Sequence, residues 1–178
     1  MTDEMIMEAV KNGDLQQASL LFERYHKRIF SFLARMAMDQ DLAEDLTQNV
    51  FLRMIKYRGS YKAGLKFQSW IYQMARNIFS DHYQANKNRY SNFVNVEKMS
   101  DRIEDLGNED QEQREQLLQR SLALLDTDQR ELLVLTRFQH MKYEEVATLM
   151  ETTVANIKVK VHRAIAKLRE HYFELEKS

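Results

Sequence analysis

The sequence predicts an all-α protein of two small helical domains, an N-terminal helical bundle and a C-terminal helix-turn-helix domain, joined by an acidic linker. Apolar residues recur at helical spacing along nearly the whole chain, and no strand-like alternation is long enough to assign. The 178 residues include four Gly and no Pro, so few residues interrupt a helix. Residues 91–112 are polar, acidic and weakly periodic, which is typical of an interdomain linker. The alternative is a surface helix within a single domain.

The first long helix is expected from Asp14 to Met38. Gly13 ends a short preceding helix, and Asp14 can cap the next one. A single apolar stripe predicts the buried face of the long helix: Leu15, Ala18, Phe22, Tyr25, Ile29, Phe32 and Met36.

The second helix, from Asp41 to Tyr57, has two different faces. Its core stripe is expected at Ala43, Leu46, Val50, Met54 and Tyr57. The opposite face mixes acids with three large apolar side chains, which favours a protein-docking surface made of Asp41, Glu44, Asp45, Gln48, Phe51, Leu52 and Ile55. Alternatively, another helix of the bundle covers Phe51 and Ile55.

A basic block follows, since residues 52–89 carry eight Lys and Arg and one Asp. Such a block is typical of a polyanion-binding surface, and the alternative is a solvated basic face. Residues 57–67 contain two of the four glycines and are expected to form a loop. The next helix, from Gln68 to Asn86, is expected to bury Phe67, Ile71, Met74, Ile78 and His82.

The opposite face of this helix combines an aromatic ring with amides. Flat rings and amides suit unpaired bases, which offer faces for stacking and edges for hydrogen bonds. The face comprises Trp70, Gln73, Asn77, Asp81 and Gln84, and Tyr57, Tyr61 and Phe67 lie in or beside the adjoining loop. Alternatively, Trp70 and Phe67 are ordinary core residues.

Helical periodicity returns at Leu117, and Asp126 or Thr127 is expected to cap a helix that ends near Phe138. Residues 138–168 then predict a helix, a short turn and a second helix that starts at Thr152 or Thr153. The predicted buried residues are Val146, Leu149 and Met150 in the first helix and Val154, Ile157, Val161, Ile165 and Leu168 in the second.

Such a helix pair places its second helix in the DNA major groove. Residues in its first two turns are expected to read bases, namely Asn156, Lys158, Val159 and Lys160. Residues further along are expected to contact phosphates, namely Arg163, Lys167 and Arg169. Plain helical packing is the alternative.

The sequence favours a binding protein over an enzyme. The absence of Cys excludes disulfides, thiolate catalysis and Cys-based zinc sites. The five His are scattered, and no HExxH motif, phosphate-binding glycine loop or nucleophile elbow is found. We therefore expect no catalytic residue, no cofactor and no metal. No signal peptide or transmembrane segment is visible, which indicates a cytoplasmic protein without direct membrane binding.

Three segments together resemble the extracytoplasmic-function, or group IV, sigma factors of the sigma-70 family. DLAEDLTQNVFLRMIK (41–56) is similar to their polymerase-docking helix, and FQSWIYQMARNIFSDHY (67–83) to their minus-10 reading helix. YEEVATLMETTVANIKVKVHRAIAKLRE (143–170) is similar to their minus-35 reading helix-turn-helix. The resemblance implies a sigma region 2 domain at residues 1–90, a linker at 91–112 and a sigma region 4 domain at 113–178.

The resemblance also implies a function, partners and site residues. A sigma factor binds core RNA polymerase and directs promoter-specific transcription initiation, and an anti-sigma factor, commonly tethered to a membrane, is a further expected partner. The docking face of helix 41–57 would bind core polymerase. The minus-10 strand would be read by Tyr61, Lys62, Lys66, Trp70, Gln73, Arg76 and Asn77. The minus-35 duplex would be read by Thr153, Asn156, Lys158, Val159, Lys160, Arg163 and Lys167.

Within the minus-10 set, the resemblance places Asn77 in the pocket for a flipped base and gives the loop 59–66 a part in base preference. One departure from the family concerns Glu151, which stands in the helix-turn-helix turn where Gly is usual. A non-Gly residue with positive φ there costs about 1 kcal/mol. The alternative function is a stand-alone helix-turn-helix transcriptional regulator with an N-terminal sensing or dimerisation domain.

Overall fold

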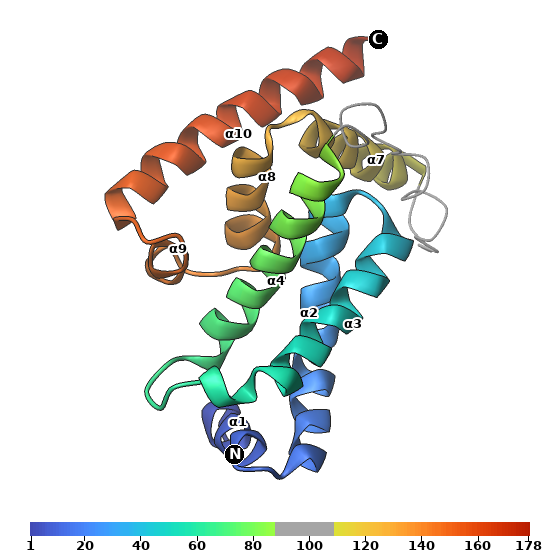
Figure 1. Cartoon of the computed structure of the whole chain (residues 1–178). Helices are drawn as coiled ribbons and strands as arrows, with labels where there is room; N and C mark the ends of the chain where they lie inside the picture. Colours follow the sequence, from blue (N-terminus) through green and yellow to red (C-terminus); the bar gives the residue numbers. More distant parts are fainter. Residues whose placement is uncertain (88–108) are drawn as a thin grey trace. The chain divides into compact units, whose positions relative to one another are not determined.

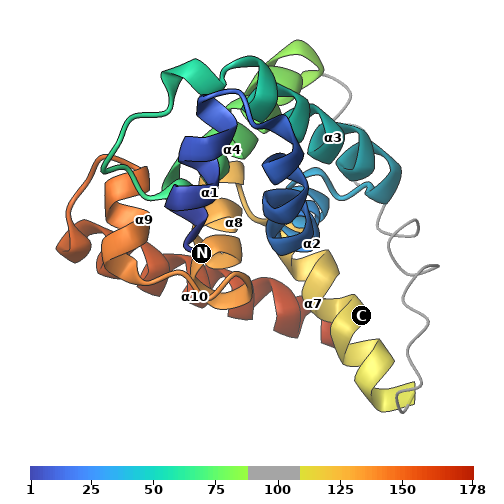
Figure 2. The same ribbon diagram turned by 90° about the horizontal axis from the view of Figure 1, so that it is seen from below.

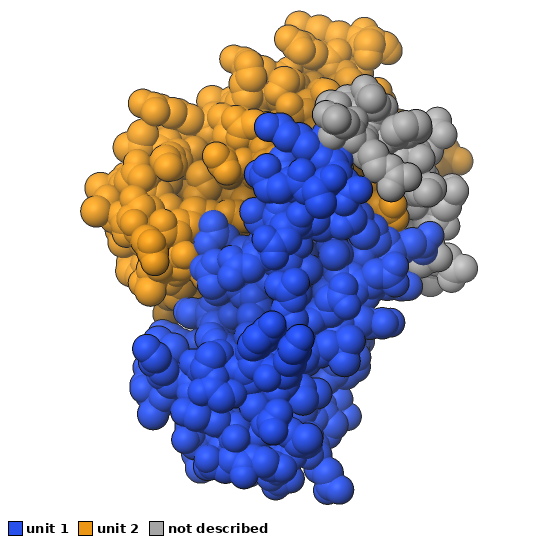
Figure 3. Space-filling view, viewed as in Figure 1, with its two compact units in different colours: residues 1–37, 41–90 blue, residues 38–40, 91–178 orange. Residues whose placement is uncertain are grey.

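Figure 1 shows the computed structural model of the chain, which describes residues 1–87 and 109–178. The described residues form helices and turns without any strand, which confirms the predicted all-α class. The chain divides into two compact units, one of Met1–Ala37 with Asp41–Tyr90 and one of Met38–Gln40 with Ser91–Ser178 (Figure 3). Most of the predicted linker, residues 91–108, lies outside the described residues, and residues 109–112 already belong to a helix.

The first unit is a bundle of helices. It contains α1 (Asp3–Lys11), the short 3-10 helix η1 (Leu15–Gln17), α2 (Ala18–Ala37), α3 (Gln40–Lys56), the 3-10 helix η2 (Arg58–Ser60) and α4 (Phe67–Ala85). Helix α1 packs against α2 and α4, and α2 also packs against α4 (Figures 1 and 2). The long helices begin and end within one or two residues of the positions that the apolar pattern predicts, apart from α2.

Helix α2 begins later than predicted because the backbone turns at its start. Gly13 has φ 107° and ends α1 with two hydrogen bonds, from Asp14 N–H to the Ala9 carbonyl (3.0 Å) and from Gly13 N–H to the Val10 carbonyl (3.1 Å). These two bonds form a Schellman motif, in which glycine is the favoured residue at the position of Gly13. The chain then forms η1, and the side chain of Asp14 makes no capping hydrogen bond, so the predicted cap is wrong.

The core of the first unit follows the predicted stripes with five corrections. Leu15, Phe22 and Tyr57 are 43–50% exposed, and Met74 and His82 are half-buried, although the sequence pattern placed all five inside. On α2, Leu21, which adjoins Phe22, is fully buried instead. Two apolar residues stand next to each other at positions 21 and 22, so periodicity by itself does not show which one faces the core.

The second unit consists of α7 (Glu109–Leu124), α8 (Thr127–Leu133), the π-helical segment η3 (Val134–Phe138), α9 (Tyr143–Leu149) and α10 (Val154–Lys177). Helix α10 packs against α7, α8 and α9. Asp126 caps α8, as predicted, by accepting a hydrogen bond from Gln129 N–H (2.8 Å). The Arg130 guanidinium donates to the carbonyls of Leu122, Ala123 and Leu125 at 3.0–3.2 Å. It therefore supplies hydrogen-bond donors to carbonyl groups at the C-terminal end of α7.

Within residues 1–87 and 109–178, no helix is long and apolar enough to cross a membrane. The same residues contain no group of three or more His, Asp or Glu arranged to hold a metal ion.

Candidate nucleic-acid interface

Helices α9 and α10 form the predicted helix-turn-helix. The turn is a second Schellman motif, with hydrogen bonds from Thr152 N–H to the Ala147 carbonyl (2.9 Å) and from Glu151 N–H to the Thr148 carbonyl (3.3 Å). Glu151 has φ 54°, the left-handed conformation that the resemblance indicated for this position. The geometry of the turn is therefore kept without glycine.

The start of α10 is held by two threonine side chains. The Thr153 hydroxyl accepts a hydrogen bond from Asn156 N–H (3.1 Å) and so forms the N-cap. The Asn156 amide nitrogen donates to the Thr152 hydroxyl (2.7 Å). Thr152 was not among the predicted site residues, although its spacing of four from Asn156 is the sequence signal that one helix turn separates them. Asn156 is half-buried, and its amide is oriented before any DNA binds.

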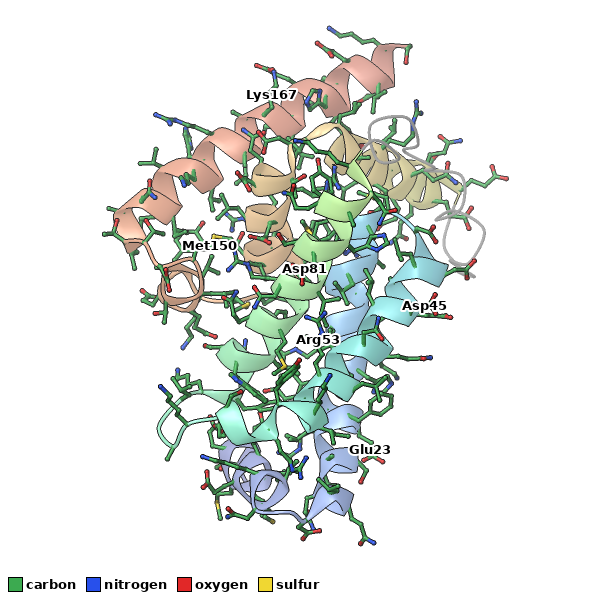
Figure 4. The ribbon with its side chains drawn as sticks, in the orientation of Figure 1. Glu23, Asp45, Arg53, Asp81, Met150 and Lys167 are labelled. Carbon is green, nitrogen blue, oxygen red and sulfur yellow. The ribbon has the colours of Figure 1, made fainter. Side chains whose placement is uncertain are left out.

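The remaining predicted minus-35 residues share the outer face of α10. Ile157, Val161 and Ala164 are buried and hold the helix against the unit. Five predicted residues are exposed on the face away from this stripe: Lys158, Val159, Lys160, Arg163 and Lys167. The Lys167 ammonium lies 3.2 Å from the Glu170 carboxylate, and both side chains are exposed (Figure 4). The arrangement combines cations for phosphates with an apolar Val159 that suits a thymine methyl group.

On α4, three polar side chains of the predicted minus-10 face form a hydrogen-bonded row. Arg76 donates to the Gln73 amide oxygen (3.2 Å), and the Gln73 amide nitrogen donates to the Asn77 amide oxygen (2.9 Å). Asn77 is exposed, whereas Gln73 and Arg76 are half-buried. The row orients the Asn77 amide group, whose nitrogen can donate to an acceptor on a base edge. Asp81, further along the face, lies 3.7 Å from Arg53 of α3 (Figure 4).

Trp70 and the loop before α4 form an aromatic cluster at the other end of this face. The Trp70 ring is half-buried and lies 5.2 Å from the Tyr61 ring and 6.2 Å from the Phe67 ring. Phe67 is fully buried and packs edge-to-face on Tyr25, which fits the alternative that it is an ordinary core residue. Trp70 keeps part of its ring accessible for stacking.

Tyr61 differs from its prediction as a base-contacting residue. Its side chain is 1% exposed, and its hydroxyl donates to the Leu65 carbonyl (2.6 Å). The structure therefore places Tyr61 inside the unit, where its ring cannot stack on a base. The neighbouring Lys62 and Lys66 are exposed, as a phosphate-binding role requires.

The predicted docking face of α3 is exposed except at its apolar centre. Asp41, Glu44, Asp45 (labelled in Figure 4) and Gln48 are exposed, and Leu52 is 64% exposed. Ile55 is half-buried. Phe51 is 6% exposed and packs edge-to-face on Phe22 of α2 at 5.0 Å, so it belongs to the core and not to the surface.

Two family models match the chain in the order that the motifs predict. Sigma-70 region 2 matches residues 21–89, and Sigma-70, region 4 matches residues 115–168. The chain is 33% identical over 172 residues to RNA polymerase sigma factor CarQ of Myxococcus xanthus, which covers 96% of this chain and 97% of the relative. It is 24% identical to the ECF RNA polymerase sigma-E factor of Escherichia coli (strain K12), covering 92% of this chain and 91% of that one.

Two solved structures have the same fold. CnrH, in complex with the cytosolic domain of CnrY, has a TM-score of 0.71 at 21% identity and covers 94% of this chain and 95% of its own. The sigma factor RpoE from Bartonella quintana, in complex with the anti-sigma factor NepR, has a TM-score of 0.66 at 24% identity, with coverage of 89% and 96%.

Proposed function

The chain belongs to the extracytoplasmic-function group of the sigma-70 family and is a sigma factor for promoter-directed transcription initiation, and we propose which of its surfaces binds each partner. Residues 1–90 dock on core RNA polymerase and capture the melted minus-10 strand, and residues 113–178 read the minus-35 duplex. Residues 91–112 link the two. The observation that carries the proposal is the pair of family models, matched in order, whose residues include the exposed polar faces of α3, α4 and α10.

The minus-10 strand binds along α4. Lys62, Lys66 and Arg76 neutralise phosphates, and Trp70 stacks on a base. Asn77 donates its amide hydrogens to the edge of a flipped base, in an orientation that the row from Arg76 through Gln73 supports. Such a site favours strand separation because it restores interactions that an extruded base loses.

The minus-35 duplex binds the outer face of α10. Lys158, Val159 and Lys160 reach base edges from the first turns of the helix, beside Thr153 and Asn156. Arg163 and Lys167 contact phosphates and set the register of the helix in the groove. Lys167 must leave Glu170 to do so, and this exchange costs little because the ion pair is exposed.

Core polymerase binds the acidic face of α3. Leu52 supplies the apolar contact that the buried Phe51 cannot, and the surrounding Asp41, Glu44, Asp45 and Gln48 supply the polar rim. Two structural neighbours were solved as complexes, one with the cytosolic domain of CnrY and one with the anti-sigma factor NepR. By analogy, we propose that an anti-sigma factor also binds this chain and holds it inactive.

The protein performs no catalysis of its own, needs no cofactor and acts in the cytoplasm, where polymerase and promoter DNA are present. Its contribution is binding energy and sequence choice, and polymerase makes the RNA chain.

In vitro transcription with core polymerase, with and without the full-length protein, tests the proposal. We expect specific transcripts in the presence of the protein and none without it. A stand-alone helix-turn-helix regulator would instead bind promoter duplex tightly without core polymerase and would add no promoter specificity to it. Gel-shift titrations with and without core polymerase separate the two functions.

A further inference from the structure

Tyr61 is fully buried although it lies in a loop. Its side chain is 1% exposed between η2 and α4, and its ring packs edge-to-face on Trp70 at 5.2 Å. The hydroxyl donates to the carbonyl of Leu65, four residues later, at 2.6 Å. A buried hydroxyl that spans its own loop restrains the backbone between the two residues.

The segment that Tyr61 spans is a tight turn. Leu65 N–H donates to the Lys62 carbonyl (3.2 Å), and Gly64 has φ 92°, a conformation that L-residues rarely adopt. Two hydrogen bonds, one from the side chain and one from the backbone, therefore close residues 61–65. Outside this closed turn, Lys62 and Lys66 are exposed and Leu65 is 45% exposed.

Helix α1 packs against the two elements that flank Tyr61, η2 before it and α4 after it. The buried residues of α1 are Ile6, Met7 and Val10, and the helix is labelled in Figure 2. Burial raises the pKa of the Tyr61 hydroxyl, and the charges of Glu4, Glu8 and Asp3 raise it further. The hydroxyl therefore stays protonated and keeps its donor role through the neutral range. Residues 1–20, which include α1, precede the part of the chain that the region 2 model matches.

We propose that Tyr61 is a positioning residue that, with α1 packed against the flanking η2 and α4, holds the turn 62–65 preformed so that the exposed groups of the turn discriminate one base of the minus-10 strand. The inference rests on the proposed function, in which this loop adjoins the base-binding face of α4. A turn held in its binding conformation loses less conformational entropy when the strand binds. A loosened turn adapts to several bases, so loss of the Tyr61 hydrogen bond should reduce discrimination between bases more than it reduces total binding of the strand.

The test uses Tyr61→Phe, which removes the hydroxyl and keeps the ring. Tyr72→Phe is the matched control, because Tyr72 is also a fully buried tyrosine of the first unit, and its ring packs on Phe32 of α2. Full-length proteins with core polymerase are assayed for transcription from all single-base variants of the minus-10 element. We expect Tyr61→Phe to reduce the preference at one position about three- to tenfold, as loss of one hydrogen bond implies, and Tyr72→Phe to leave the preferences unchanged.

A second variant, Gly64→Ala, disturbs the same turn independently. A Cβ at Gly64 meets no atom within 4 Å, so the substitution acts through the positive φ and not through a clash. We expect it to reduce the preference at the same position. Unchanged preferences in both loop variants, or an equal change in Tyr72→Phe, would overturn the inference. Absence of specific transcription by the wild-type protein would instead overturn the proposed function.

Discussion

Replacing Glu151 by glycine should stabilise the helix-turn-helix. Glu151 has φ 54° in the turn between α9 and α10, and the same pair of Schellman hydrogen bonds surrounds Gly13 at the end of α1. A left-handed conformation costs an L-residue about 1–2 kcal/mol, and glycine loses about 0.5–1 kcal/mol more backbone entropy on folding. The difference predicts that Glu151→Gly raises the free energy of unfolding of the second unit by about 0.5–1 kcal/mol.

Native-state hydrogen exchange of the α10 amides is the appropriate measurement. Circular dichroism sums the helices of both units, so it does not report on the second unit alone. Tryptophan fluorescence reports on the first unit, because Trp70, the only tryptophan, lies there. The expected stabilisation slows exchange of the slowest α10 amides about two- to fivefold. Promoter preference at minus-35 should stay unchanged, because the residues on the outer face of α10 are unaltered.

Two further variants separate backbone strain from charge. Glu151→Ala removes the carboxylate and keeps an L-residue in the left-handed conformation. It should therefore change the free energy of unfolding of the second unit by no more than about 0.5 kcal/mol. Gly13→Ala makes the reverse change in the other Schellman motif, where φ is 107° and no atom lies within 4 Å of the added Cβ, and by the same two terms it should destabilise the first unit by about 0.5–1 kcal/mol. Faster α10 exchange in Glu151→Gly, or equal stabilisation by Glu151→Ala, would refute the strain argument.

Three other predictions concern the proposed interfaces. Asp45→Arg combined with Leu52→Glu should abolish pull-down of core polymerase without loss of helical circular dichroism, since both side chains are exposed on α3; normal binding by the folded variant would remove this face from the docking site. Lys160→Ala should weaken discrimination at one minus-35 position by about 1–3 kcal/mol. Lys167→Ala should weaken binding to all sequences evenly and lower the slope of log K against log salt concentration by about one. Identical behaviour of the two variants would contradict the assignment. Asn77→Ala should lower the permanganate reactivity of duplex promoters far more than it weakens binding to core polymerase, and the activity of the variant should recover on promoters that are already unpaired. Wild-type melting of the duplex by this variant would place the base pocket elsewhere.

The helices could be predicted from the sequence because each buries one periodic stripe. Ile157 and Val161 of α10 and Ala43 and Val50 of α3 are buried where the pattern expects them. The opposite faces follow by exclusion, so the periodic pattern alone is enough to identify the exposed cations of α10 and the exposed acids of α3. The pattern failed where two apolar residues are adjacent, as at Phe22, because periodicity does not distinguish a residue on the core from one at its margin.

Loop residues have no period, so their burial depends on contacts from distant parts of the chain. Tyr61 is buried partly because α1 contacts η2, more than forty residues later in sequence, and no spacing within residues 57–67 indicates this. Its type, an aromatic beside Lys62, suggested stacking on a base, whereas its hydroxyl restrains the turn that carries the lysine. We therefore propose that two kinds of residue set base preference at minus-10. Those on α4 would act by contact and are visible in the sequence as a helix face. Tyr61 would act through backbone geometry, and a substitution in the core of this unit would then change promoter choice without touching DNA.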